Sequence, residues 1–183
     1  MTFGHGTAPA ETITALLREA GVVSVVDIRI APGSRRNPQV ARAALEEWLP
    51  AAGVAYRWEK RLGGFRKAAA DSPDAVWREP AFRGYAGYMR QDGFATAIDG
   101  VLDEVAGLDA GLDTGRRVAV MCSESVWWRC HRRLVADFVL LARRLPVRHL
   151  MHDGRLMEHQ PSEGVRVRDD GSLVYDGGQG TLL

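Results

Sequence analysis

The sequence has almost no lysine, only two cysteines, no long apolar run and no surplus of either charge. The 24 basic and 23 acidic side chains give a formal net charge of +1. This balance argues against a general binder of long nucleic acid, because such proteins carry a surplus of positive charge. No segment approaches the roughly 18 apolar residues of a membrane span, and the N-terminus has no secretory pattern. We therefore expect no membrane association.

Two cysteines are also too few for a fold that depends on several disulfide bonds. We expect a cytoplasmic protein with reduced thiols. The chain has 183 residues with 46% hydrophobic and 26% charged side chains, which is typical of one globular domain and excludes wholesale disorder.

The basic residues are unevenly divided, since 22 of the 24 are arginines and only two are lysines. Compositional bias explains most of them. A subset, however, has a second interpretation, since the planar guanidinium forms two parallel hydrogen bonds to an anion and lysine does this poorly.

Strand-like and helix-like segments alternate along the chain. The predicted strands are 2–5, 22–28, 54–58, 117–122 and 147–151. Helices are predicted after Thr7, after Asn37, and over 82–89, 94–105 and 129–144. The alternation predicts a three-layer, Rossmann-like α/β domain with a mostly parallel sheet over 1–160. A turn at Asp169–Ser172 predicts a small C-terminal β-hairpin, so 161–183 is assigned to that hairpin and a peripheral tail.

Ligands of such sheets bind at the carboxyl ends of the strands, where the loops meet. That rule gathers residues that are far apart in the sequence into one predicted cleft. They are His5 after the first strand, Asp27, Arg29, Arg35 and Arg36 after the second, and Cys122, Glu124, Cys130, His131 and Arg132 after the fourth.

The most informative segment begins with Cys122 at a strand end and continues into a helix. Loop amides and the helix dipole stabilise negative charge there and lower the pKa of a thiol. Cys122 is thus a candidate nucleophile, with His131 or His5 as acid or base and Glu124 as the orienting group. Alternatively it is a buried core thiol, since cysteine is among the most buried residue types.

The same segment also supports a metal hypothesis. Cys122, Cys130, His131 and His5 are ligand types that zinc prefers, although there is no paired Cys-x-x-Cys. In a third, structural interpretation, His131 caps a carbonyl or pairs with Glu124.

The remaining candidates have both structural and functional interpretations. Asp27 and Arg29 lie at the end of a buried strand, where a charged side chain either forms an ion pair or has a role in binding or catalysis. Arg35 and Arg36 precede a helix and suit an anion or simply a solvated loop. Tyr85 lies on a helical core face, yet its hydroxyl could reach the cleft. Trp127 and Trp128 could be core residues or a lid.

A resemblance follows from motifs spread over about residues 2–160. They are the segment Phe3-Gly4-His5-Gly6, then Val26-Asp27-Ile28-Arg29, Ser34-Arg35-Arg36-Asn37-Pro38 and Leu62-Gly63-Gly64, and finally Met121-Cys122-Ser123-Glu124 with Cys130-His131-Arg132. Together they resemble domain-of-unknown-function family 488. Gly6 stands where that family usually has serine, and residues 125–128 are more aromatic than its usual spacer. The resemblance implies a family and site positions but no particular reaction.

A weaker, architectural similarity is to rhodanese and cysteine-phosphatase domains, which also carry Asp-x-Arg after an early strand and a cysteine loop before a helix. Five residues separate cysteine and arginine in their loop, whereas six separate Cys122 from Arg129.

Three functions are consistent with the sequence. The first is an enzyme acting on a small anionic, phosphate- or nucleotide-like substrate, with Arg29, Arg35, Arg36 and Arg132 holding the anion. The second is a non-catalytic module that binds a nucleotide or nucleic-acid fragment through stacked aromatics. The third is a Cys/His metal-binding protein. The sequence leaves the cofactor, the substrate and the oligomeric state open.

Overall fold

The computed structural model describes residues 1–108 and 115–178. Its centre is a six-stranded sheet with the order β3-β2-β4-β1-β5-β6. The strands of this sheet are β1 (Thr2–Gly4), β2 (Val22–Asp27), β3 (Ala55–Trp58), β4 (Arg117–Cys122), β5 (Arg148–Leu150) and β6 (Leu156–Glu158). All neighbouring pairs from β3 to β5 are parallel, and only β6 is antiparallel, to β5.

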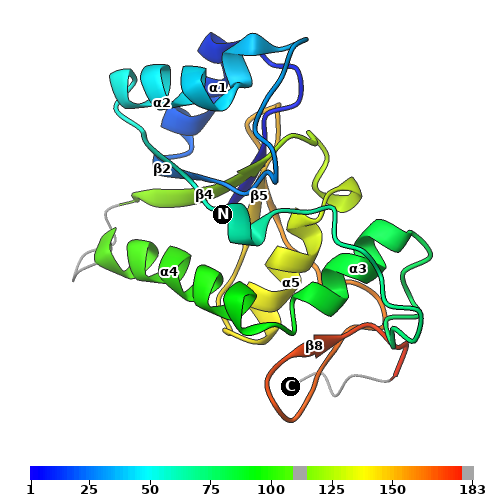
Figure 1. The fold of residues 1–183 in the computed structure, drawn as a ribbon. Helices are drawn as coiled ribbons and strands as arrows, with labels where there is room; N and C mark the ends of the chain where they lie inside the picture. The colour runs from blue at the N-terminus through cyan, green and yellow to red at the C-terminus, as the bar shows by residue number, and fades with distance from the viewer. Residues whose placement is uncertain (109–114, 179–183) are drawn as a thin grey trace.

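Helices cover both faces of this sheet, which makes three layers (Figure 1). The five α-helices of the described residues are α1 (Ala10–Glu19), α2 (Arg42–Ala51), α3 (Pro80–Tyr88), α4 (Asp92–Leu108) and α5 (Arg132–Leu141). Helices α1 and α2 pack on one face, and α4 and α5 pack on the other with α3 beside them. The predicted α/β class with a mostly parallel sheet is confirmed.

The alternation of side chains along β4 explains how one strand serves two cores. Val118, Val120 and Cys122 belong to the buried cluster on the α4–α5 face. Ala119 and Met121 belong to the cluster on the α1–α2 face. Because successive side chains of a strand point to opposite faces, a continuous apolar run is what a strand buried on both faces requires.

The topology creates a crevice between β1 and β4. These strands are neighbours, with Gly4 in register with Cys122. The chain leaves β1 for α1 on one face of the sheet and leaves β4 for α5 on the other face. Strand order reverses where neighbouring strands connect to opposite faces, and open α/β sheets bind ligands at that point.

Several boundaries differ from those predicted. Helix α1 begins after Pro9 rather than after Thr7, because Pro9 supplies the carbonyl that accepts from Ile13 and already has extended backbone. Three-residue 3-10 helices occupy Pro38–Val40, Lys60–Leu62 and Trp127–Arg129, so α5 begins only at Arg132. Strand β6 was not predicted, since three half-exposed or exposed edge residues carry no periodic pattern.

The predicted C-terminal hairpin is present as β7 (Arg166–Val167) and β8 (Leu173–Val174). Leu173 and Tyr175 are buried in the same cluster as α4 and α5. The division at residue 160 stays a prediction, and most of the predicted tail, 179–183, lies outside the described residues.

A buried carboxylate attaches this C-terminal segment to α5. Asp137 accepts hydrogen bonds from His159 Nε2 at 2.8 Å, Ser162 Oγ at 2.7 Å and the Tyr175 hydroxyl at 3.0 Å. It also accepts from the Ser162 amide at 2.9 Å. His159 continues the chain of contacts to His149, whose ring stacks on Trp127 at 4.2 Å between centroids. The network therefore connects the C-terminal segment with the loop after β4.

Replacing Asp137 with alanine is expected to lower the free energy of unfolding by about 3 to 5 kcal/mol, because three buried donor residues lose their acceptor. Urea denaturation measures this. Asp99→Ala is the matched control, since Asp99 forms an exposed ion pair with Arg143 and its loss should cost no more than about 1 kcal/mol. Equal losses for the two variants would contradict the role given to Asp137.

Candidate functional site

A cleft of about 1010 Å³ opens at the carboxyl edge of the sheet, over the crevice between β1 and β4. The loops after β1, β2 and β4 line it, together with the irregular segment around Gly64 and the start of α3. Its volume is that of a site for a small organic molecule.

Two cysteines and a histidine meet at this cleft. Cys122 ends β4, and Cys130 and His131 precede α5. His131 Nδ1 is 3.8 Å from Cys122 Sγ and 3.7 Å from Cys130 Sγ, and the three ligand-type atoms lie within 4.8 Å of one another. Both thiols are free and buried, yet both line the cleft.

A buried arginine stands beside this thiol pair. Arg132 is 1% exposed, and its Nε and Nη1 have no hydrogen-bond partner among the described residues. Its Nη2 approaches the Ser125 carbonyl at 3.5 Å. No carboxylate in the described part of the chain forms an ion pair with it. A buried guanidinium without a counter-ion is costly, so a nearby anion is required.

The Cys122 thiol is the group that meets this requirement. The pKa of Cys122 is held well below its usual value by the neighbouring Cys130 thiol, which can donate to it, and then by His131 and Arg132. The same interaction with Cys122, together with burial, raises the pKa of Cys130. The pair thus keeps its first thiolate on Cys122 and its proton on Cys130.

Glycine at position 4 lets Arg132 come this close. A Cβ atom on Gly4 would stand 2.2 Å from Arg132 Nη1 and 1.8 Å from the Glu124 carbonyl oxygen. Any side chain there would displace the guanidinium and the loop after Cys122. The absence of a side chain at Gly4 therefore leaves the space that the Arg132 guanidinium and the loop after Cys122 occupy.

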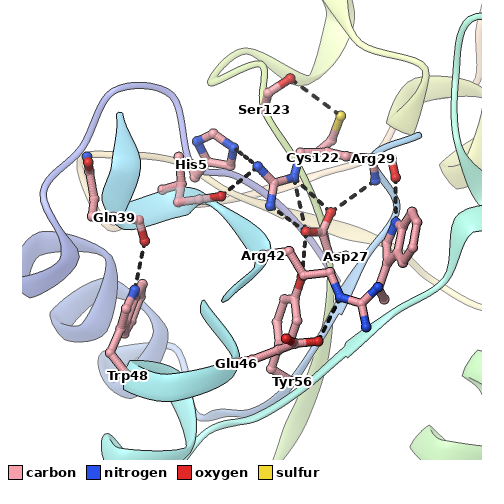
Figure 2. A network of polar contacts seen from close by, with 12 residues as sticks. His5, Asp27, Arg29, Gln39, Arg42, Glu46, Trp48, Tyr56, Cys122 and Ser123 are labelled. Atoms are coloured by element: carbon pink, nitrogen blue, oxygen red, sulfur yellow. Dashed lines mark hydrogen bonds and ion pairs between the residues drawn. The ribbon is translucent and has the colours of Figure 1, made fainter. Parts of the chain in front are cut away.

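A buried ion pair between Asp27 and Arg29 lies at the centre of a network of polar contacts next to Cys122 (Figure 2). Arg29 Nε is 2.9 and 3.0 Å from the two carboxylate oxygens of Asp27, and Tyr56 donates to the same carboxylate at 2.8 Å. Arg29 Nη1 contacts His5 Nε2 at 3.2 Å and the Val40 carbonyl at 2.8 Å. These contacts, with a further bond from Nη2 to Asp27, fix the guanidinium of Arg29 at the cleft.

These contacts also determine the tautomer of His5. Its Nδ1 lies 2.8 Å from the Gly6 carbonyl, which can only accept, so Nδ1 carries the proton. Its Nε2 faces the Arg29 donor and must accept. Burial, and then the charge of Arg29, lower the pKa of His5. Both nitrogens are therefore already hydrogen-bonded, Nδ1 to the Gly6 carbonyl and Nε2 to Arg29.

The structure divides the predicted site residues into two sets. Lining the cleft are His5, Arg29, Cys122, Glu124, Cys130 and His131. Away from the lining are Asp27, Arg35, Arg36, Tyr85 and Arg132. Asp27 and Arg132 lie just behind the wall, whereas Arg35 and Arg36 are exposed on the loop after β2. Tyr85 is fully buried and donates to the Leu62 carbonyl at 2.7 Å, so its hydroxyl is already used.

Sequence reasoning missed two parts of the lining. Gly64 lies so close to the site that a Cβ atom there would stand 3.0 Å from His131 Nδ1. Its neighbour Phe65 lines the cleft with 88% of its surface exposed. The Gly63-Gly64 pair was a signal for close backbone approach, but a lone phenylalanine in an irregular segment carries no pattern. Arg129, which the sequence placed among the arginines on loops at this edge of the sheet, is an exposed lining residue.

The fold and the site together define an α/β domain with a two-cysteine cleft at the switch point of its sheet. The chain belongs to the family described as Domain of unknown function DUF488, whose model matches residues 9–139. That range includes Asp27, Arg29, Cys122 and His131, whereas His5 precedes it. No curated protein and no solved structure matches the chain. None of the helices in the described ranges is long and apolar enough to cross a membrane.

The charge arrangement predicts the titration of Cys122. Its alkylation rate by iodoacetamide, followed by mass spectrometry of the Cys122 peptide across pH, should inflect well below the value of about 8.5 of a free cysteine. In Cys130→Ala the inflection should move upward, because the strongest stabiliser of the thiolate is removed. An inflection at the ordinary value, or one unmoved in Cys130→Ala, would contradict this charge assignment.

Proposed function

We propose that this protein is an enzyme whose Cys122 thiolate attacks a small anionic substrate of the phosphate- or nucleotide-like class. The observation that carries the proposal is the position of Cys122. Its sulfur lies on the cleft at the sheet's switch point, beside the buried cation of Arg132. Nucleophilic cysteines need a lowered pKa and access to substrate, and structural core thiols have neither.

Anion recognition has three sources in the cleft. Arg129 is an exposed lining residue, and the Arg29 guanidinium adds its positive charge at the cleft wall. Helix α5 begins next to Cys130 and His131, so the positive end of its dipole faces the same space. A local positive cleft on a chain of net charge +1 suits a small anion better than a long polyanion.

The chemistry is written here for a phosphomonoester. Cys122 Sγ forms a bond to phosphorus as the bond from phosphorus to the alcohol oxygen breaks, and His131 in its protonated form gives its proton to the departing alkoxide. Water then attacks the phosphocysteine, His131 takes one proton from that water, and inorganic phosphate leaves as the thiolate returns. Atoms and charge balance over the two steps, and no external oxidant or reductant is needed.

The proposal predicts separate effects on turnover and binding. Cys122→Ser should reduce hydrolysis of para-nitrophenyl phosphate by on the order of 10³ or more while inorganic phosphate still binds in calorimetry. Arg129→Gln should weaken phosphate binding about fivefold. Arg35→Gln is the matched control, because Arg35 is also exposed but is not a lining residue of the cleft, and it should bind like the wild type. Undiminished turnover by Cys122→Ser would overturn the proposal, and phosphate binding without any turnover would favour a binding module.

A second candidate function is supported by the geometry of the same three side chains. Zinc bonds of about 2.3 Å to sulfur and 2.0–2.1 Å to nitrogen put tetrahedral ligands about 3.6 Å apart. The two sulfur-to-Nδ1 distances, 3.8 and 3.7 Å, fit this arrangement. Cys122, Cys130 and His131 would then hold the ion, with a fourth position for water or substrate. His5, the fourth predicted ligand, is outside the group because Arg29 and Gly6 use its nitrogens.

Metal analysis distinguishes the two candidates. For a metal protein, material purified without chelator or a nickel column should carry about one zinc ion per chain. Cys130→Ala should lose it, and bound zinc should protect Cys122 from alkylation. A chain that stays empty after zinc supplementation would overturn the metal candidate and leave the nucleophile proposal standing.

A further inference from the structure

The most exposed large apolar side chain in the described residues stands on the candidate site. Phe65 is 88% exposed, and Trp128 is 44% exposed. Both line the cleft that contains Cys122. Single exposed apolar residues are ordinary, but two aromatic rings on one cleft mark a binding surface.

The backbone on both sides of Phe65 is held in place. Gly63 packs so closely that a Cβ atom on it would stand 2.8 Å from the Ile30 side chain, and Gly64 packs on His131. Arg66 stacks over the Tyr88 ring at 3.8 Å and donates to the Gly63 carbonyl. Phe65 itself has φ of 58°, a left-handed conformation that is rare and mildly strained for a phenylalanine. An anchored segment thus presents one ring to solvent, although the ring contributes little packing to the fold.

The orientation of Trp128 is supported by its neighbour Trp127. Trp127 stacks on His149 with an interplanar angle of 5°, and the two tryptophan rings meet edge to face at 5.7 Å. Trp127 is therefore committed to the interior and Trp128 remains on the cleft. Of the three aromatic residues for which the sequence suggested stacking on a base, Trp127, Trp128 and Tyr85, Trp128 is an exposed lining residue of the cleft, and Phe65 joins it there.

Both aromatic residues adjoin segments that lead to the cysteines. Phe65 follows the glycine that touches His131, and His131 touches both cysteines. Trp128 is two residues before Cys130. A phosphate group alone would leave most of a cleft of about 1010 Å³ to water. The volume and its aromatic lining fit a ligand with a flat ring next to its anionic group.

We infer that the cleft selects substrates in which a planar aromatic group adjoins the anion, as in aryl or nucleoside monophosphates, and that Phe65 and Trp128 contact that ring. The inference rests on the proposed function, since it names the substrate class of the same site. Face contact between rings needs no particular hydrogen-bond pattern, so the pair would tolerate several ring systems.

Calorimetry on Cys122→Ser, which binds without turnover, tests the inference with methyl phosphate and phenyl phosphate as probes. Phenyl phosphate should bind about tenfold or more tightly than methyl phosphate, as expected of aromatic stacking. Adding Phe65→Ala or Trp128→Ala should remove most of that preference and leave the affinity for methyl phosphate unchanged. Thermal unfolding should be unaffected by Phe65→Ala, because the ring is almost fully exposed.

Val167→Ala is the matched control, since Val167 is 44% exposed on the C-terminal hairpin, away from the cleft lining. It should keep the full preference for phenyl phosphate. Equal affinities of the two probes would overturn this inference and leave the proposed function intact. Failure of both probes to bind would overturn the proposed function and the inference together.

Discussion

The structure of the site depends on one buried cation, Arg132. Its guanidinium is enclosed between β1 and the loop after β4, where no carboxylate of the described residues pairs with it. Leaving a charge unpaired in the interior would cost several kcal/mol. A thiolate on Cys122 supplies the counter-charge, and the Cys130 thiol and His131 supply donors to it. The burial of Arg132 and the lowered pKa of Cys122 are therefore linked.

The rest of the fold places and holds that arrangement. Parallel strands β1 and β4 bring Gly4 level with Cys122, and their connections to opposite faces open the crevice above them. The buried pair of Asp27 and Arg29 fixes one wall through His5. On the other side, Asp137 connects through two histidines to Trp127 and thus to the loop that carries Cys130. Both networks hold loops that line the cleft.

Much of this could be predicted from the sequence, for identifiable physical reasons. The alternation of strand-like and helix-like segments predicts a mostly parallel sheet. Because ligands of such sheets bind at the carboxyl ends of the strands, it then predicts that His5, Arg29 and Cys122 share a cleft. The roles of single residues could not be predicted in the same way. Arg35 and Arg132 are both arginines next to a helix start, yet one is solvated and the other is buried, because only Arg132 faces the gap left by Gly4. The position of Phe65 on the cleft could not be predicted, because the exposure of a single side chain on an irregular segment leaves no pattern in the sequence.

The most direct test of this account is the ultraviolet absorbance of the thiolate at neutral pH, compared between the wild type and Cys122→Ser. The account predicts that the wild type shows the absorbance of about one thiolate per chain and that the variant loses it. The signal should persist after extensive treatment with a chelator, because Arg132 and the Cys130 thiol stabilise the anion without a metal. Identical spectra for the two proteins would mean that Cys122 is protonated, and would contradict the central claim.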